Sequence, residues 1–474
     1  MREMVFQSGA AIQVDFLTLL SACATTNIIL RSSNAGVPWR LAAVQGHSIR
    51  GVDARDCDAS SGPTIYASGS RNSGNNVNWN FDQSWVEWTG AGGNGLFSNA
   101  ANWWPPAVPG EGDWVRVANA LPMTSAAPVT IRNLFIGGGS GTAQMTANAA
   151  LNVIENVKLF RDGTLLLNSP SVVGGNVDIL AGALLSHSGN TSAQVNSLNL
   201  RVCGNMVVQS NGSVNVSSKG HSIGNGPGRS SGSRGASHGG RGTPSNESGP
   251  CYDSVIAPTN LGSGSSYGGG GGAILLAVSG DLRHDGLMCA DAVPGTHANG
   301  SGGSIWITSG AMLGTGIIRA AGASGFAGGG GGGRISLVVT NQGAKLQDFT
   351  GVVSAYGGGG GTIYIQNAAD GPGRGTALVK DSSGNTDVPP SPPCVTNEAE
   401  FIAFHITNSA ILRLTNDFML GDIFLQSVNS KLDLGFKTLT VRSREHDLGV
   451  GSVTNYGAII WWPDVHKGSV FSTW

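Results

Sequence analysis

Charged side chains are scarce in this sequence. Asp, Glu, Lys and Arg make up 12% of the 474 residues, against roughly a quarter in an average soluble domain. The formal net charge is −2, which implies neither a basic surface for nucleic acid nor a strongly acidic one. The sequence also lacks any run of about 18 apolar residues, so it predicts no membrane-spanning helix.

Cysteine is sparse as well, with six in the whole chain. There is no Cys-x-x-Cys pair and no regular spacing of cysteines, so a zinc site has no support. Cys203 and Cys289 occupy apolar positions of expected strands, where a cysteine acts as a small hydrophobic residue. An even number of cysteines permits disulfides without requiring them. We therefore predict no metal ion and no cofactor.

Glycine, in contrast, is abundant, with 75 residues, and much of it lies in runs. Each run is followed directly by an apolar segment of alternating, β-branched character, which is typical of a strand. The pairs are Gly268–Gly272 with Ala273–Val278, Gly302–Gly303 with Ser304–Ile307, Gly328–Gly333 with Ile335–Val339, and Gly357–Gly361 with Thr362–Ile365. A second apolar piece follows, so the repeated unit is strand, turn, strand, glycine loop.

Such a unit cannot bury its apolar face alone. Copies stacked about 4.8 Å apart pair every backbone group with the copies above and below. The pattern therefore predicts an all-β chain folded as a parallel β-helix or a similar β-solenoid. We expect the glycine runs to be external loops, because glycine accepts positive φ and lets backbones approach closely. A nucleotide cradle is not favoured, since neither Gly-Lys-Ser/Thr nor a helical pattern follows any run.

Two further stretches carry a family resemblance. Asp56–Gly62 with the tail Asn72–Phe81 closes a first module, and Trp88-Thr89-Gly90, Asn102-Trp103 and Pro109–Asp113 open a second. Together with the glycine repeats, they resemble the glycine-rich right-handed parallel β-helix repeats of very large bacterial surface proteins, of pectin-lyase-like or autotransporter-passenger type. The resemblance covers about residues 6–440 and implies a right-handed β-helix with long glycine-rich loops.

The same patterns divide the chain into four parts. We expect terminal turns of a first β-helix module at 1–82, a W-x-G … N-W opening segment at 83–125, a glycine-rich β-helix at 126–395 and C-terminal β-helix rungs at 396–474. Residues 217–266 are almost all Ser, Gly, Asn, Arg and His, and a loop of this length is expected to be functional or loosely ordered. A proline-rich break, Val388–Pro393, precedes the last part.

The stretch Phe16–Cys23 resembles the end of a bacterial lipoprotein signal. Gln13 and Asp15 interrupt its apolar region, however, and favour a strand. We expect the signal and the anchor of the natural protein to lie outside this sequence.

Enzymes that act on pectin often use a parallel β-helix, and inverting hydrolysis needs paired carboxylates that hold the acid and the water. The polygalacturonase-like signature has counterparts only in fragments, namely Asn385-Thr386-Asp387, Gly220-His221 and Arg334-Ile335. Their order differs from the signature, and no Asp-Asp pair occurs. We predict no catalytic residues and a protein that is not an enzyme.

Two polar clusters are further candidates. Asp53, Asp56 and Asp58 lie close together with Arg55, and this spacing favours solvated turn carboxylates over a calcium site. The other cluster lies in the long glycine-rich segment, where we expect its members to keep a polar loop soluble rather than to bind a ligand. Its members are His221, His238, Arg229, Arg234 and Arg241.

These expectations combine into a non-catalytic, secreted or cell-surface bacterial β-helix, adhesin-like or a structural stalk. The expected partner is an extracellular polysaccharide or another cell surface, and not nucleic acid. Glycan binding would use exposed aromatic residues, for which the candidates are Trp306, Tyr364 and Trp461-Trp462, with core packing as the alternative for each. The rival hypothesis is a polysaccharide lyase or glycoside hydrolase whose acids meet only in the folded chain. An inert spacer is a third.

Overall fold

The computed structural model describes residues 2–20, 28–81, 85–244, 247–295, 297–324, 328–380, 385–387, 398–443 and 445–462. Cys23, the proline-rich break Val388–Pro393 and the expected boundary at 395/396 lie outside these residues. Over the described ranges the protein is all-β, with strands β1 to β44 and three short 3₁₀ helices. None of these helices has the length and apolar character needed to cross a membrane.

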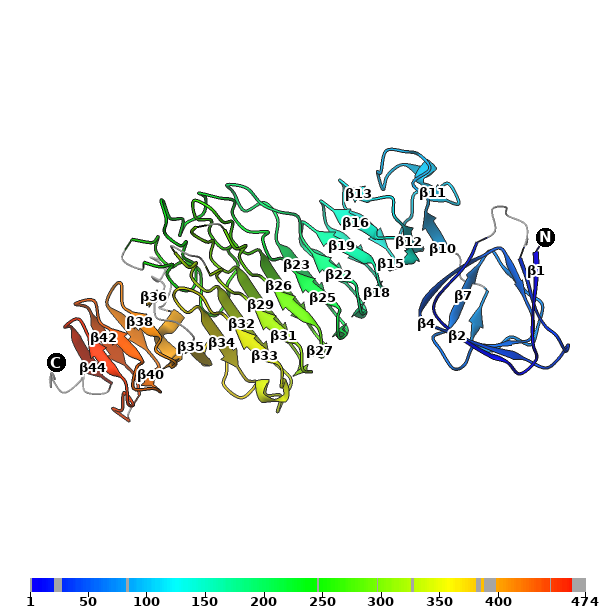
Figure 1. Cartoon of the computed structure of the whole chain (residues 1–474). Coiled ribbons are helices and arrows are strands. Elements are labelled where there is room, and N and C mark those ends of the chain that lie inside the picture. Colours follow the sequence, from blue (N-terminus) through cyan, green and yellow to red (C-terminus); the bar gives the residue numbers. More distant parts are fainter. Residues whose placement is uncertain are drawn as a thin grey trace. The chain divides into compact units, whose positions relative to one another are not determined.

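Backbone contacts divide the chain into two compact units. The first comprises Met1–Leu166, Ser171–Leu185 and Asn211–Ser213, and the second comprises Leu167–Pro170, Ser186–Ser210 and Val214–Trp474. Each unit is built from sheets in which parallel pairing predominates (Figure 1).

The N-terminal part of the first unit consists of two sheets. One contains β1 (Arg2–Phe6), β3 (Ile28–Ser32), β5 (Val52–Ala54) and β8 (Arg71–Asn72); the other contains β2 (Ala11–Leu20), β4 (Trp39–Arg50), β7 (Ile65–Ser68) and β9 (Trp79–Asn80), with β6 (Cys57–Asp58) beside β4. β2 pairs with β4 in parallel. Phe16–Leu20 belongs to β2, which confirms the strand prediction for that part of the signal-like stretch. Leu30, Trp39 and Ile49 are among the buried residues of the core.

Three more sheets complete the first unit, and consecutive strands of the chain enter them in turn. The strands are β11 (Trp103–Trp104), β10 (Trp85–Trp88), β12 (Trp114–Asn119), β15 (Asn133–Ser140), β18 (Val157–Leu159) and β21 (Val177–Ile179) in one sheet; β13 (Met123–Ser125), β16 (Ala143–Ala147), β19 (Gly163–Leu167) and β22 (Leu184–Ser186) in the next; and β14 (Val129–Ile131), β17 (Leu151–Val153) and β20 (Ser171–Val173) in the third. The short helix η1 (Ala100–Asn102) precedes β11.

The second unit follows the same rotation among sheets. Its strands are β24 (Met206–Val208), β27 (Leu282–His284) and β30 (Met312–Leu313); β25 (Ser213–Asn215), β28 (Leu287–Cys289), β31 (Ile317–Arg319) and β33 (Val352–Ser354); and β23 (Leu198–Val202), β26 (Ala273–Val278), β29 (Ser304–Ser309), β32 (Arg334–Val339), β34 (Thr362–Gln366), β35 (Thr376–Val379), β37 (Ala403–Ile406) and β40 (Asp422–Leu425). Helix η2 (Leu346–Asp348) lies between β32 and β33.

Two smaller sheets accompany the C-terminal strands of the second unit. They contain β36 (Asn385–Asp387), β38 (Ile411–Arg413), β41 (Lys431–Asp433) and β43 (Ser452–Thr454), and β39 (Phe418–Leu420), β42 (Thr438–Val441) and β44 (Ala458–Trp461), with η3 (Glu398–Phe401) before β37. Apolar side chains of these two sheets and of β37 form a continuous core that includes Phe404, Leu412 and Leu439.

In-register stacking of like residues holds the core of the second unit together. Ile274 pairs with Ile305, Ile305 with Ile335 and Ile335 with Ile363 on successive parallel strands, and all four are buried. Because successive side chains of a strand point to opposite faces, the isoleucines mark the inward row and the residues next to them along each strand point outward. These four strands are the ones that the glycine-run pattern predicts.

The glycine runs are buried, which contradicts the expectation that they form external loops. Most residues of Gly268–Gly272 and Gly328–Gly333 are buried, and none of these glycines has a positive φ. They belong to no strand, yet their backbones hydrogen-bond from one repeat to the next, as in Gly302 N–H to Gly331 O at 3.0 Å. Glycine is required here for close backbone approach and not for a left-handed conformation.

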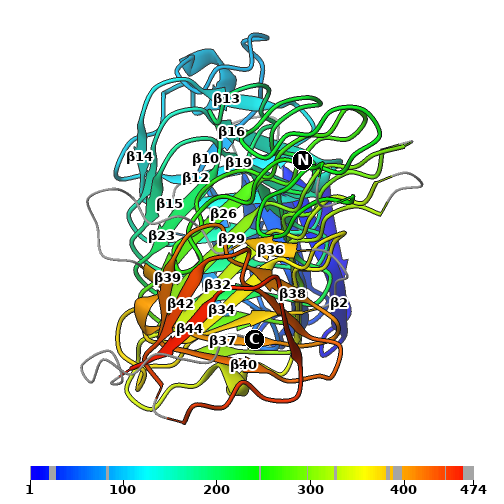
Figure 2. The ribbon, with the colours of Figure 1, turned by 90° about the vertical axis from the view of Figure 1, so that its left-hand side faces the viewer.

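Residues 217–244 and 247–266 form no strand and lie as a second layer over these glycine runs. Gly220 N–H donates to Gly270 O at 2.9 Å, Gly240 N–H donates to Gly332 O at 2.9 Å, and Ala236 O accepts from Gly331 N–H at 2.8 Å. In Figures 1 and 2 this segment is drawn in green. Added methyl groups at Gly235, Gly240 or Gly331 would overlap carbonyl groups of the facing chain. The layer therefore depends on glycine on both sides.

Replacing Gly303 by Ala tests the close backbone approach between successive glycine runs. The new Cβ would overlap the carbonyl oxygen of Gly272, and overpacking against backbone costs about 1–3 kcal/mol or more. Gly189→Ala is the matched control, because its Cβ would meet no atom within 4 Å. Urea unfolding should show a large loss for Gly303→Ala and a change within about 0.5 kcal/mol for Gly189→Ala. Equal stability of both variants would contradict the packing.

Candidate functional site

The outward face of β23, β26 and β29 carries the candidate site. Asn199, Leu275 and Trp306 lie side by side in one row, because the three strands pair in register. Two residues further along the three strands, Arg201, Ala277 and Thr308 form the neighbouring row, in which Arg201 is exposed. These positions alternate with the buried isoleucines, so the strand period of two places Trp306 outward.

A groove of about 220 Å³ runs across this face. Its lining consists of Asn199, Leu275, Leu276, Ala277, Trp306 and Thr308. Trp306 and Leu275 are half-buried and supply an apolar surface, while the Asn199 amide and the Thr308 hydroxyl supply hydrogen-bonding groups. No acidic or basic side chain belongs to the lining. The groove can thus hold a neutral ring with polar substituents, but it offers no acid for proton transfer.

The groove ends where residues 253–261 cross the same sheet. The hydroxyl of Ser336 donates to Ile256 O at 2.7 Å, that of Ser304 donates to Asn260 O at 2.6 Å, and the Gln194 amide donates to Thr259 O at 2.9 Å. Ser336 is next to Trp306 in the outward row, yet it is fully buried. The crossing segment therefore determines how far the exposed face extends.

The other aromatic candidates do not line this groove. Tyr364 continues the outward row but is 1% exposed, and its hydroxyl donates to Gln366 and accepts from Gly375 N–H. The core-packing alternative therefore holds for Tyr364. Trp461 is half-buried against the C-terminal core with its ring stacked on His446, and Arg442 lies over the ring of Trp462.

A buried polar cluster anchors the crossing segment. Asp253 accepts hydrogen bonds from the backbone N–H groups of Thr259 and Asn260 at 3.0 and 2.9 Å, and the Ser304 hydroxyl oxygen lies 3.0 Å from the same carboxylate. Nε2 of His238 lies 3.3 Å from the same carboxylate, and Nδ1 lies 2.8 Å from Gly302 O. Burial alone would raise the pKa of Asp253, but hydrogen bonding and charge from His238 and the backbone N–H of Asn260 outweigh it and lower that pKa.

The structure corrects the expectation for the histidines of the glycine-rich segment. His238 is 0% exposed and His221 is 7% exposed, so neither keeps a loop soluble. Burial lowers the pKa of His221. Among the arginines of this group, Arg229 is exposed, Arg234 is half-buried and contacts Glu247, and Arg241 forms an ion pair with Asp387 at 2.8 Å. No sequence pattern predicts the pairing of His238 with Asp253, because fourteen residues separate them in the sequence.

The hydrolase-like fragments serve the packing of the second unit. Arg334 is fully buried and donates to Tyr252 O at 2.8 Å and to the Thr362 hydroxyl at 3.0 Å. The Thr386 hydroxyl contacts Gly360 O, and Asp387 is paired with Arg241. None of these residues lines the groove.

The acidic cluster of the first unit does not converge on one point. Asp53 pairs with Arg31 at 3.0 Å, Asp56 accepts from the Asn75 amide at 2.8 Å, and Asp58 accepts from Ser60 N–H at 2.9 Å. Each carboxylate therefore has its own partners. Asp53 and Asp56 are buried, so the expectation of solvated turn carboxylates is wrong for these two. Within the described residues, no group of three or more His, Cys, Asp or Glu is placed to hold a metal ion.

One cysteine differs from expectation. Cys289 is buried in β28, as an apolar strand position predicts, but Cys203 follows β23 and is exposed. The expectation that Cys203 fills an apolar position is therefore wrong. Both are free thiols, and burial raises the pKa of Cys289 to about 12.

Comparison of this chain with protein-family models, with curated proteins and with solved structures gave no match. The groove and the polar cluster therefore have to be interpreted from their own chemistry.

Asp253→Asn tests the anchoring role of the polar cluster. Because the carboxyl ionises at lower pH in the folded state, its stabilising effect is complete above the unfolded pKa of about 4 and is lost as pH falls below it. We expect Asp253→Asn to lower the free energy of unfolding by about 3 kcal/mol at pH 7, with the gap to wild type narrowing towards pH 2.

Thermal unfolding between pH 7 and pH 2 measures this gap. Asp281→Asn is the control, since Asp281 is exposed and only its Oδ1 contacts Asn341, at 3.4 Å. A constant difference between wild type and Asp253→Asn over the whole pH range would refute the assignment.

Proposed function

We propose that this chain is a secreted or cell-surface right-handed parallel β-helix that binds glycans without cleaving them, as an adhesin-like stalk. Two observations support the fold: consecutive strands enter three parallel sheets in turn, and like residues stack in register. The resemblance of the glycine repeats to bacterial surface proteins supports the location. The observation that carries the function is the groove with Trp306 on an outward sheet face.

The chemistry of the groove suits a sugar ring. An indole face packs against the apolar C–H face of a pyranose, and the neighbouring Asn199 and Thr308 can exchange hydrogen bonds with its hydroxyl groups. Parallel strands repeat at about 4.8 Å, so the surface is extended along the stack, as a polymer requires.

The alternative of a lyase or hydrolase needs acids at the substrate. Inverting and retaining hydrolysis both use a pair of carboxyl groups that flank the scissile bond. The groove lining has no carboxyl group. The buried Asp253 is already engaged by the backbone N–H groups of Ser254, Thr259 and Asn260, by the Asn260 amide and by His238. We therefore favour binding over cleavage.

A glycan array, with depolymerisation assayed on the same polysaccharides, tests the proposal as a whole. We expect retention on a subset of glycans and no release of shorter chains. Release of oligosaccharides would contradict the non-catalytic assignment. Absence of binding to every glycan would leave an inert spacer as the better account.

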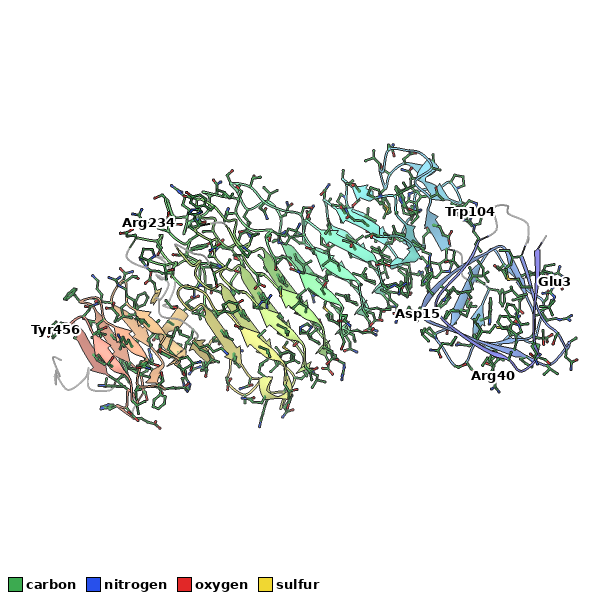
Figure 3. All side chains as sticks on the ribbon, viewed as in Figure 1. Glu3, Asp15, Arg40, Trp104, Arg234 and Tyr456 are labelled. Atoms are coloured by element: carbon green, nitrogen blue, oxygen red, sulfur yellow. The ribbon has the colours of Figure 1, made fainter. Side chains whose placement is uncertain are left out.

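Trp306→Ala tests the groove itself. Loss of the indole should weaken binding of any retained glycan by at least about tenfold, equivalent to about 1.4 kcal/mol. Tyr456→Ala is the matched control, because Tyr456 is an aromatic residue of the same unit that is 75% exposed and does not line the groove (Figure 3). Equal affinity of wild type and Trp306→Ala at unchanged thermal stability would place the binding site elsewhere.

A further inference from the structure

The first unit contains a cavity of its own, with aromatic walls and two cationic side chains. Its volume is about 60 Å³, enough for a group of a few heavy atoms. Tyr66, Trp85 and Phe135 supply aromatic walls, with 5.9 Å between the ring centroids of the first two and 4.7 Å between those of the last two. Arg116 and Lys158 contribute the positive charge.

One edge of the buried Arg116 guanidinium group is unpaired within the described part of the chain. It lies in β12 and is 4% exposed, and its Nη1 donates to the backbone oxygen of His47. Nε and Nη2 have no hydrogen-bond partner among the described residues. These two nitrogens share one edge of the planar group, and that edge binds a carboxylate through two parallel N–H···O bonds. Leaving two buried donors unpaired is unfavourable, so the edge points to a missing acceptor.

No carboxylate of the described residues is hydrogen-bonded to this edge. Glu87 lies opposite Arg116 on β10 and its charge acts on the Arg116 guanidinium group, but its carboxylate is hydrogen-bonded to Arg50 at 2.9 Å. Asp178, on β21, lies opposite Lys158, and burial raises the pKa of the Asp178 carboxyl group.

His47 adds no charge to this site. Its Nε2 accepts the Tyr66 N–H at 2.7 Å. Burial, followed by the charges of Arg116 and Lys158, lowers the pKa of His47 to about 3, so the ring is neutral near pH 7.

We propose that this cavity binds the carboxylate of a small organic acid, with its two oxygens on Nε and Nη2 of Arg116 and its apolar part against the aromatic walls. A phosphate group could accept hydrogen bonds from the same two nitrogens. The aromatic lining and the small volume favour a carboxylate that carries a short apolar tail. Thr64 and Lys158 are half-buried, so the wall reaches solvent on their side. This site is independent of the glycan groove and does not rest on the function proposed for it.

Titration of the whole chain with propionate tests the proposal, with propionamide as the neutral isostere and inorganic phosphate as the competing anion. Binding is followed by the tryptophan indole N–H signals in NMR and by the thermal midpoint. We expect propionate to shift one indole signal saturably and to raise the midpoint, while propionamide does neither. Equal effects of propionate and propionamide, no effect of propionate, or a response to phosphate alone would each overturn the proposal.

Arg116→Lys keeps the charge but removes the two parallel N–H donors of the guanidinium group. It should weaken propionate binding about tenfold or more. Lys158→Gln changes a half-buried residue at the mouth and should weaken binding a few-fold through the lost charge; if Arg116→Lys does not fold, this variant decides. Arg132→Gln is the control, since Arg132 is an exposed arginine of the same unit and should leave binding unchanged. Unaltered affinity in both cavity variants would overturn the assignment.

Discussion

Close approach of one backbone to another is the constraint on which the second unit depends. Where Gly302 donates to Gly331 and Gly240 donates to Gly332, no side chain separates the chains, and a single added methyl group would overlap a carbonyl. Backbone hydrogen bonds therefore take over the role that side-chain packing has in an ordinary core. This explains how a chain with few charged residues and so much glycine can still be ordered, since nearly every buried N–H and C=O must find a partner.

The covering layer also shapes the outward surface. Residues 217–244 and 247–266 lie on the glycine runs, and one part of that layer, residues 253–261, crosses the sheet and contacts Ser304 and Ser336. The Asp253 and His238 pair holds this crossing where the glycine layer meets the strands. As a result, one outward row of side chains is exposed at Trp306 and covered at Ser336. The layer and the candidate groove are thus parts of one arrangement.

Local patterns predicted the strands well. The alternation in Ala273–Val278 and in the segments after the other glycine runs predicts β26, β29, β32 and β34 to within two residues at each end, because period-two burial is a property of the segment itself. The burial of the glycine runs was not predicted. A run of glycine has the same sequence pattern whether it forms a solvated loop or is covered by another segment of the same chain. Here residues distant in sequence cover it, as Gly240 covers Gly332.

For the candidate sites, too, the local sequence does not show which residues a distant segment covers. Trp306 and Tyr364 both occupy the outward row that alternation predicts, and nothing near either residue distinguishes them. Tyr364 is nevertheless buried, with the crossing segment and the C-terminal core over it, while Trp306 lines the groove. Arg116 sits in a strand pattern like that of its neighbours, and only the approach of His47 and Tyr66, from much earlier in the chain, encloses it. Recognition surfaces in a stacked fold therefore arise from which segment covers which row, and that is decided by contacts between residues distant in sequence.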